Sequence, residues 1–443
     1  MAQRRSGAEE LTGLHPVDIE PLRPLVVARA VGTGASVPVE CCQICGHAPL
    51  DEALSLGYMP PVNQMVQIGE MPRQQAWFPT NLLHCRTCDL VQLGLAVDPA
   101  IIFPPDYPYT SGTTKLLRDN FADLHRESAA LLGLGKDDLI VDIGSNDGTL
   151  LSNFQNGGHR VLGVEPTDVG DIASKRGIPT VKRYFSPAVA REVRRLHGAA
   201  SVVTAANCFA HIEDVHAIVD GIVDMLAPGG AFISESHYLV GLLDTLQYDT
   251  VYHEHLRYYT LASIKHLLEM HDLEVFHARA IPSHGGSIRV YAARRGVHEV
   301  RDSVARMLDG EPRGIAMVQR LMSFRRDVVL SKLRLLAMLR DLKENGARIA
   351  GIGAPSRAST LVNYVGLDEG IIDYVCEVPG SLKIGKYMPG TRIPVVDEVR
   401  LFADQPDCAV IFSWHIADEL APKLKAKGFR GRLITPLPMA RSL

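Results

Sequence analysis

Residues 139–149, Leu-Ile-Val-Asp-Ile-Gly-Ser-Asn-Asp-Gly-Thr, decide the fold. The first five residues form an apolar run that is typical of a buried strand. The glycines that follow let the backbone turn sharply and approach a ligand at the carboxyl edge of a sheet. Similar runs recur at residues 161–164, 201–205 and 231–235, and helical segments fill the intervals. This alternation predicts an α/β fold, in which helices cover both faces of a parallel sheet.

The polar residues of this loop indicate which ligand it binds. The loop is not G-x-G-x-x-G, and it lacks the lysine of a phosphate-binding loop. Asp142 and Asp147 would repel a pyrophosphate but suit a ligand that carries an amino group and a sulfonium. Glu165 closes the next strand, where a carboxylate can accept hydrogen bonds from both ribose hydroxyls. The sequence therefore predicts a Rossmann-like methyltransferase domain that binds S-adenosylmethionine; a nucleotide fold without a cofactor is the alternative. The residues that we expect at the cofactor are Asp142, Gly144, Asn146, Asp147, Gly148, Glu165 and Asn207.

Two C-x2-C pairs precede this domain, in a stretch that glycines and prolines interrupt. Each pair can direct two thiolates toward one tetrahedral metal ion. Five of the eight cysteines precede residue 90, and in a reducing compartment such clustering favours a metal over disulfides. Four thiolates would complete the coordination of a structural Zn²⁺, whereas incidental cysteines are the alternative. The predicted ligands are Cys42, Cys45, Cys85 and Cys88, and possible substitutes for one of them are Cys41, His47 and His84.

Length and composition describe a protein of several domains. The chain has 443 residues, of which 46% are hydrophobic and 22% charged, and a formal net charge of -4. This balance argues against a protein that binds nucleic acid through a basic surface. No apolar run approaches the length of a membrane span, and residues 1–10 do not resemble a signal peptide. We therefore expect a cytoplasmic monomer with no membrane or nucleic-acid partner.

The densest polar stretch lies at residues 247–259, Gln-Tyr-Asp-Thr-Val-Tyr-His-Glu-His-Leu-Arg-Tyr-Tyr, after the fourth predicted strand. It is not H-E-x-x-H, so a zinc protease is not indicated. So many polar groups are costly to bury unless they satisfy one another, which favours a functional site over a solvated loop. A helical turn would place Tyr252 and His255 on one face, whereas an extended segment would pair His253 with His255.

Two further segments fit the same pocket. Residues 207–211 end the third predicted strand with His211, at the edge where α/β sheets bind ligands. Residues 284–289, His-Gly-Gly-Ser-Ile-Arg, form a small cationic element, although Arg289 could instead belong to an ordinary ion pair.

A second, smaller Rossmann-like α/β domain follows. Residues 299–345 are predicted to be helical, and strands are expected at 348–352, 371–375 and 408–412. The glycine-containing turn at 351–357 could meet a phosphate through its amides, although a purely structural turn is the alternative. Positive charge for that contact would come from Arg357, Lys383 and Lys386. The expected organisation is a flexible tail at 1–36, a zinc-binding module at 37–112, the cofactor-binding domain at 113–296 and the C-terminal domain at 297–443.

These motifs resemble those of the zinc-containing sugar C-methyltransferases of deoxysugar biosynthesis. The resemblance extends from about residue 40 to 420. It rests on the cysteine pairs, on Asn207 with residues 210–211, and on VDIGSNDGT at 141–149, DTVYHEH at 249–255, HGGS at 284–287, GAP at 353–355, TLVNY at 360–364 and GKYMPGT at 385–391.

The resemblance implies a three-part enzyme whose C-terminal domain helps to hold a nucleotide. The substrate would be a nucleotide-linked 4-keto deoxysugar, commonly carrying dTDP, that is methylated at carbon three. The family pattern places the catalytic base at His255 and sets Glu254, Tyr252 and His211 around the sugar. The substrate-binding residues that we expect are Tyr107, Tyr109, His253, His284, Arg289, Arg357, Lys383 and Lys386.

A histidine base suits this reaction because its unperturbed pKa lies at about 6.5. The sequence departs from the family in places. Arg357-Ala358 replaces a Lys-Gly, and residues 413–415, Ser-Trp-His, replace Ala-Trp-Asn; Ser201 and Ala206 are further differences. An O- or N-methyltransferase for another small molecule is the alternative function, followed by a zinc-knuckle protein that binds or modifies RNA.

Overall fold

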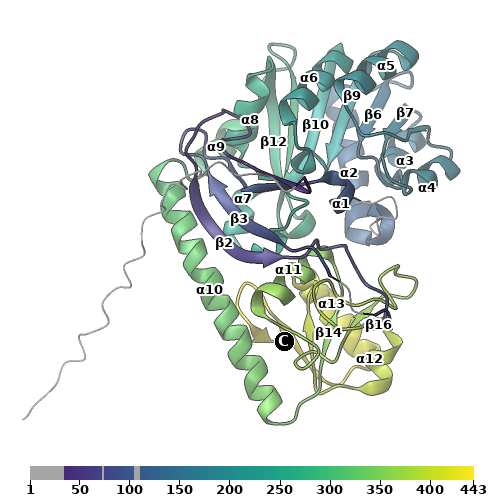
Figure 1. Ribbon diagram of the computed structural model, residues 1–443. Coiled ribbons are helices and arrows are strands. Elements are labelled where there is room, and N and C mark those ends of the chain that lie inside the picture. Colours follow the sequence, from purple (N-terminus) through teal and green to yellow (C-terminus); the bar gives the residue numbers. More distant parts are fainter. Residues whose placement is uncertain (1–33, 72–73, 104–109) are drawn as a thin grey trace, which may run out of the picture.

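The computed structural model describes residues 34–71, 74–103 and 110–443 (Figure 1). Residues 1–33 of the predicted tail lie outside these ranges, as do Tyr107 and Tyr109. The described chain forms an N-terminal module, a central sheet flanked by helices, and a C-terminal sheet. No described helix is long and apolar enough to cross a membrane.

The N-terminal module is built on a four-stranded antiparallel sheet of order β11-β4-β3-β2. Its edge strand β11 comes from the middle of the chain and lies within the polar stretch at 247–259. The module therefore holds one end of that stretch through backbone hydrogen bonds. A separate pair, β1 with β5, and helix α1 complete the module. The bounds are β1 (Ser36–Pro38), β2 (Asp51–Met59), β3 (Phe78–His84), β4 (Val91–Leu93), β5 (Leu95–Val97), α1 (Pro99–Ile102) and β11 (Arg257–Tyr258).

The central sheet has seven strands in the order β12-β13-β10-β9-β6-β7-β8. The five strands from β10 to β8 are parallel, as predicted, but β13 is antiparallel to both β10 and β12. No strand was predicted at this edge, and β13 is antiparallel there because a five-residue turn joins β12 to β13, and so short a connection requires antiparallel strands. The bounds are β6 (Leu139–Ile143), β7 (Arg160–Val164), β8 (Thr180–Val181), β9 (Ala200–Ala206), β10 (Leu226–His237), β12 (Leu273–Ile281) and β13 (Ser287–Arg294).

Helices cover both faces of this sheet because successive side chains of a buried strand point to opposite faces. Ile140 packs in the apolar core of α2 and α3, whereas Val141 packs in the core of α5, α6 and α8. Both residues are fully buried. The bounds are α2 (Lys115–Leu132), α3 (Thr149–Asn156), α4 (Gly170–Lys175), α5 (Pro187–His197), α6 (Val215–Met225), α7 (Leu239–Asp244) and α8 (Leu261–Glu269). Short 3₁₀ helices are η1 (Ser111–Thr113), η2 (Phe209–His211), η3 (Tyr248–Thr250) and η4 (Ser283–Gly285).

The helical stretch predicted at 299–345 is two helices, α9 and the long α10, because Gly310, Pro312 and Gly314 interrupt it. The C-terminal sheet follows in the order β16-β15-β14-β17-β18-β19, parallel except for β19. The strand expected at 371–375 begins only at Tyr374. The bounds are α9 (Asp302–Asp309), α10 (Ile315–Glu344), β14 (Ile349–Ile352), α11 (Ser356–Val365), β15 (Tyr374–Glu377), β16 (Val395–Asp397), α12 (Val399–Asp404), β17 (Cys408–Ile411), η5 (Trp414–Ile416), α13 (Ala417–Ala426), β18 (Arg432–Thr435) and β19 (Arg441–Ser442).

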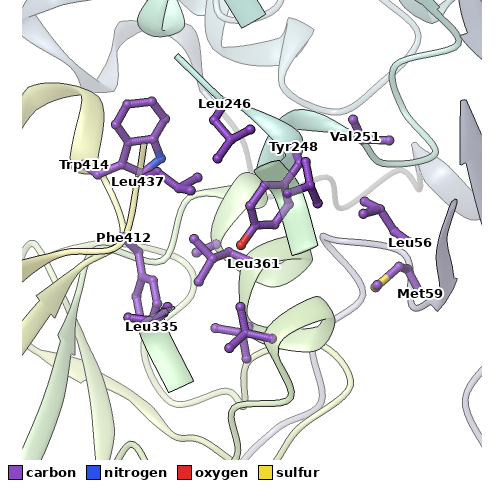
Figure 2. Close-up of a cluster of buried hydrophobic side chains, with 14 of the residues drawn as sticks. Leu56, Met59, Leu246, Tyr248, Val251, Leu335, Leu361, Phe412, Trp414 and Leu437 are labelled. Carbon is purple, nitrogen blue, oxygen red and sulfur yellow. The ribbon is translucent and has the colours of Figure 1, made fainter. Parts of the chain in front are cut away.

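One apolar core joins the three parts (Figure 2). Side chains from the N-terminal module, the polar stretch, α10 and the C-terminal sheet meet in it, and α10 runs along one side of all of them in Figure 1. Burial of this shared surface fixes the parts relative to one another. The side chains labelled in Figure 2 are Leu56, Met59, Leu246, Tyr248, Val251, Leu335, Leu361, Phe412, Trp414 and Leu437.

Candidate active site

The glycine-rich loop turns at the carboxyl end of β6, where its backbone packs closely against neighbouring segments. Gly144 and Gly148 have φ angles of +67° and +76°, which residues with a Cβ rarely adopt. A Cβ at position 144 would lie 2.8 Å from that of Cys208, and the Cys208 thiol donates to the Ile143 carbonyl at 2.8 Å. The loop and the segment after β9 therefore form one edge of the site.

Three carboxylates gather at this edge. Asp142 is buried and accepts a 2.5 Å hydrogen bond from the Thr204 hydroxyl. The pKa of Asp142 is raised to about 8, chiefly by burial; the Thr204 hydrogen bond lowers it, and the nearby Glu165 and Glu235 carboxylates raise it. A cation bound here would favour the ionised form of Asp142. The chemistry of this edge thus fits the ammonium and sulfonium groups of S-adenosylmethionine.

Glu165 has one hydrogen-bond acceptor site left for a ribose hydroxyl. Its Oε1 accepts from the backbone and hydroxyl of Thr167 at 2.9 and 2.6 Å, and its Oε2 accepts from the Asn146 amide at 3.0 Å. A carboxylate has about four acceptor sites, so Oε2 can accept one more hydrogen bond. Glu165 can therefore accept one hydrogen bond from the ribose, whereas the sequence suggested hydrogen bonds from both ribose hydroxyls.

Asn146 and Asp147 hold a neighbouring segment. The Asn146 side chain accepts from the Ser111 amide at 2.8 Å, and Asp147 Oδ2 accepts from the Gly112 amide at 3.0 Å. The other Asp147 oxygen accepts from the hydroxyl of Thr149 at 2.7 Å. Both side chains thus fix the approach to the loop, and their predicted contacts with the cofactor remain a proposal.

Asn207 occupies a strained position at the end of β9. Its φ is +61°, and its amide donates to the Glu235 carbonyl at 2.8 Å. Its side-chain Oδ1 is buried with no hydrogen-bond partner among the described residues. A buried, unsatisfied acceptor of this kind is consistent with a ligand contact.

Arg289 lies in a network of ion pairs that includes Glu235. Its side chain is fully buried, and its Nε donates to Glu235 at 2.6 Å. The remaining N–H groups meet Asp123 and Glu127, at 3.1 and 2.5 Å, and two oxygens of Asn120. Five donors thus find five protein acceptors, and the ordinary ion-pair interpretation describes Arg289 better than a contact with substrate. Arg289 lies on β13, which begins at Ser287.

The imidazole rings of His211, His255, His237 and His284 lie in sequence beside this edge and form a histidine wall. His211 and His255 stack with their centroids 5.0 Å apart, and the centroid of His237 lies 4.6 Å from that of His255. His284 follows at 5.7 Å from His237. Of the two arrangements considered for the polar stretch, the turn is present: the His255 amide donates to the Tyr252 carbonyl at 2.9 Å, and the two rings lie 4.0 Å apart.

A backbone contact fixes the tautomer of His255. Its Nδ1 lies 2.7 Å from the Thr250 carbonyl, which can only accept, so Nδ1 carries the proton in the neutral ring. Nε2 is then the acceptor. Burial lowers the pKa of His255 well below its usual value, and the neighbouring His211 lowers it further. At neutral pH the ring is therefore uncharged and able to take a proton.

The side chains of the two residues before His255 contact the N-terminal module. His253 Nε2 lies 3.0 Å from the Thr80 hydroxyl and 3.3 Å from the Pro79 carbonyl, so this ring faces β3 and not the histidine wall. Glu254 accepts a 2.7 Å hydrogen bond from the side chain of Asn63 in the N-terminal module. His253 is therefore not part of the histidine wall, where its predicted contact with substrate would lie. Glu254 lies beside the wall, directly before His255 in the chain.

Arg357 is held by the polar stretch. Its Nε and Nη2 each donate to Asp249 at 2.8 Å, and its other N–H groups meet Gln247, the His284 carbonyl and His415 at 3.0 to 3.3 Å. All five donors are again engaged, which contradicts the expectation that Arg357 provides free charge for a phosphate. The Trp414 indole also donates to Asp249 at 2.8 Å. Arg357 therefore joins the C-terminal domain to the histidine wall.

Lys383 lies beside the glycine-containing turn of the C-terminal domain. Its ammonium group donates to the Ala354 carbonyl at 2.7 Å, and the Ala354 amide donates to Glu377 at 2.5 Å. Burial lowers the pKa of Lys383, while Glu377 and Glu254 oppose that shift. Lys386 follows on the same loop, where its amide donates to the Lys383 carbonyl at 3.3 Å. The expected contacts of these two lysines with a phosphate remain a prediction.

The four predicted metal ligands meet at one point. The sulfurs of Cys42, Cys45, Cys85 and Cys88 all lie within 4.8 Å of one another, and the closest pairs are 3.5 Å apart. A tetrahedral zinc site with Zn–S bonds of about 2.3 Å requires sulfurs about 3.8 Å apart, so the arrangement fits Zn²⁺. The suggested substitutes are not needed: Cys41 is exposed, and His84 contacts Asp89 at 2.9 Å.

Comparison with known proteins agrees with this organisation. Residues 42–103 match the model of a zinc binding domain, 115–278 that of a methyltransferase domain, and 282–438 that of a C-methyltransferase C-terminal domain. The chain is also 33% identical over 410 residues to C-methyltransferase NovU of Streptomyces niveus, which spans 91% of this chain and 97% of that protein. The chain belongs to the C-methyltransferase family. This C-methyltransferase uses S-adenosylmethionine and has a four-cysteine zinc site, as its sequence predicted.

Two solved methyltransferases each match about two fifths of the C-methyltransferase chain. An S-adenosylmethionine-dependent methyltransferase from Clostridium acetobutylicum is 12% identical, covers 42% of this chain and 94% of its own, and has a TM-score of 0.32. The glycopeptide N-methyltransferase MtfA is 14% identical, covers 39% and 95%, and has a TM-score of 0.32. Likeness at this level carries no argument about the substrate.

Sequence reasoning missed several residues of the C-methyltransferase site. His237 ends an apolar strand, and its position at the carboxyl edge was the one available signal. Asp249 stands within the polar stretch, but nothing local shows that Arg357 and Trp414 are its partners. Asn63 lies in a segment without a motif, so its contact with Glu254 is visible only in the fold.

Proposed function

We propose that this C-methyltransferase methylates carbon three of a nucleotide-linked 4-keto deoxysugar, with dTDP as the nucleotide. One observation carries the proposal. A neutral imidazole, His255, lies in a buried wall beside the edge formed by Gly144 and Cys208, where we expect the cofactor to bind. His211 connects the two, since it follows Cys208 by three residues and stacks on His255.

The reaction requires a base because a saturated C–H bond does not attack a methyl donor. A ketone on the adjacent carbon makes the proton acidic by spreading the resulting charge onto oxygen. We assign proton removal to Nε2 of His255, since its Nδ1 proton is directed to the Thr250 carbonyl. The low pKa keeps the ring neutral, so it is available as a base without first losing a proton.

Donors near His255 would stabilise the enolate oxygen as its charge grows. We assign this role to Tyr252 and His211, whose rings lie 4.0 and 5.0 Å from that of His255. Burial lowers the pKa of His211 to about 4, so it would act as a neutral donor. Glu254 lies beside this wall and is assigned to a sugar hydroxyl.

Bound S-adenosylmethionine supplies the methyl group as an electrophile. The side chains of Asp142, Glu165 and Asn207 would hold it, while Gly144 and Gly148 allow its close approach. On the substrate side, the turn at 353–356 with Lys383 and Lys386 would bind the diphosphate, and His284 would face the sugar. Tyr107 and Tyr109, which the sequence also predicts to bind substrate, lie outside the described residues.

Incubation with methyl-labelled S-adenosylmethionine and a panel of nucleotide 4-keto deoxysugars tests the proposal. We expect label on carbon three of a dTDP sugar, together with exchange of the α proton for deuterium in D₂O. Label on an oxygen or nitrogen, without deuterium exchange, would support the alternative of an O- or N-methyltransferase. Label recovered in RNA and absent from every sugar would overturn the small-molecule assignment.

A further inference from the structure

Asn63 lies where the three parts of the chain meet. It belongs to the N-terminal module, between β2 and β3, and its side chain is buried. Its Nδ2 donates to Glu254 Oε1 at 2.7 Å, and its Oδ1 accepts from the Ser356 hydroxyl at 3.1 Å. Glu254 belongs to the central part, and Ser356 opens α11 of the C-terminal part.

The chemistry of the partners fixes the orientation of this amide. An ionised carboxylate only accepts hydrogen bonds, so the nitrogen of Asn63 must face Glu254. The amide oxygen must then face Ser356, whose hydroxyl can donate. The result is a directed relay from Ser356 through Asn63 to Glu254. An alanine would remove both contacts, and an aspartate would remove the donor.

The two ends of the relay have different predicted roles. Ser356 ends the turn at 353–356 that we assign to the diphosphate, two residues after Ala354, whose carbonyl accepts from Lys383. Glu254 precedes His255, which we assign as the base. One buried side chain of the N-terminal module thus connects the nucleotide end of the site with its catalytic end.

We propose that Asn63 is a positioning residue that holds the Glu254 carboxylate against the sugar and couples it to the nucleotide-binding turn. This role rests on the proposed function. Asn63 touches neither cofactor nor reacting atoms in this assignment, and it acts through Glu254. The N-terminal module therefore contributes to turnover and does not only stabilise the fold.

The first test compares Asn63→Ala with Asn81→Ala. Asn81 is a matched control because its amide also donates to a glutamate, Glu52, within the same module. Its side chain points to the opposite face of β3 from that of Thr80, which meets His253. For methyl transfer to a dTDP-linked 4-keto deoxyhexose, we expect Asn63→Ala to lower kcat by about 10- to 100-fold and to change KM by less than about 3-fold. Asn81→Ala should retain the wild-type values.

The second test uses Asn63→Asp, which places a second carboxylate against Glu254. Two adjacent carboxylates share a proton, so one of them has a raised pKa. We expect the residual turnover of this variant to fall as pH rises through that ionisation, a limb that the wild-type profile lacks. A merely structural role would change stability but would not add a pH-dependent limb.

The outcomes separate the two proposals. A wild-type protein that transfers no methyl group to any 4-keto sugar refutes the proposed function. An active wild type, with Asn63→Ala at an unchanged kcat, overturns only the role of Asn63. If Asn63→Ala does not fold, as shown by its thermal unfolding, the pH profile of Asn63→Asp decides, and a profile that matches the wild type counts against the relay.

Discussion

The imidazole rings of His211 and His255 lie stacked, with centroids 5.0 Å apart and planes inclined by 30°. His211 follows strand β9 of the central sheet, and the Leu256 amide beside His255 donates to the Ala210 carbonyl at 2.9 Å. Backbone and rings together thus fasten the polar stretch to the carboxyl edge of the sheet. The assigned base lies on the same side of the molecule as the glycine-rich loop, which the proposed reaction requires.

The His255→Asn variant should lose most turnover but keep its affinity for S-adenosylmethionine. General-base catalysis contributes about 100- to 10,000-fold, and an amide cannot accept the proton. Methyl transfer and calorimetric titration measure the two effects. His277→Asn is a suitable control, because His277 lies on β12 and meets Ser303 at 2.7 Å, outside the wall. Near-normal turnover of His255→Asn would remove His255 as the base.

Short sequence patterns correctly predicted the features that depend on a few neighbouring residues. The strand at 139–143 was predicted at the bounds it has, and the two cysteine pairs form one cluster of four sulfurs. Both signals are contained within a few residues. The same is true of the family motifs, which led to the correct family.

Distant partners could not be predicted from local patterns. Arg289 pairs with Glu127, which lies 162 positions away, and Arg357 with Asp249, 108 positions away. A sequence shows the charge of an arginine but not the acceptors that surround it. Both arginines were therefore expected at the substrate, although the fold uses them to join segments. The turn at Tyr252–His255 likewise depends on pairing between β11 and β4, which no local pattern reveals.

Substitution of one zinc ligand should disrupt the N-terminal module. Cys85→Ser removes a thiolate from a four-sulfur site, and a small module depends on its metal for folding. We expect loss of bound zinc and of methyl transfer, because β11 next to His255 pairs with β4 of this module. Binding of S-adenosylmethionine to the central sheet should persist. Metal analysis and calorimetry measure these effects.

The exposed Cys41 provides the control for this experiment. Cys41→Ser should keep both zinc and activity. A Cys85→Ser protein with full zinc content and wild-type thermal stability would contradict a structural role for the metal.

Binding of S-adenosylmethionine should release a proton near neutral pH. The pKa of Asp142 is raised to about 8, so most molecules carry this proton at pH 7 in the free protein. A bound cation favours the carboxylate, and the proton must leave. Affinity should therefore increase from pH 6 to pH 8 and level off above it. Titration in two buffers with different ionisation enthalpies measures the proton release directly.

Two variants make this prediction specific. Asp142→Asn should bind S-adenosylmethionine more weakly and without the pH dependence. Asp137→Asn, which changes an exposed aspartate at the opposite end of β6, should behave as the wild type. An affinity that does not vary between pH 6 and pH 8 would show that Asp142 does not change its protonation on binding.

The pair of Asp249 and Arg357 should couple the stability of the C-terminal domain to the catalytic stretch. Both side chains are buried, and Asp249→Asn would leave the guanidinium without its countercharge. Breaking such a pair from one side costs about 3–5 kcal/mol in free energy of unfolding. Replacing both residues, as in Asp249→Asn with Arg357→Met, should cost less than the sum of the single changes, because no lone charge remains.

Asp341→Asn, which breaks the exposed contact with Arg340, should change the stability by less than about 1 kcal/mol. Urea denaturation measures all four variants, and strictly additive losses at 249 and 357 would show that the two charges do not depend on each other.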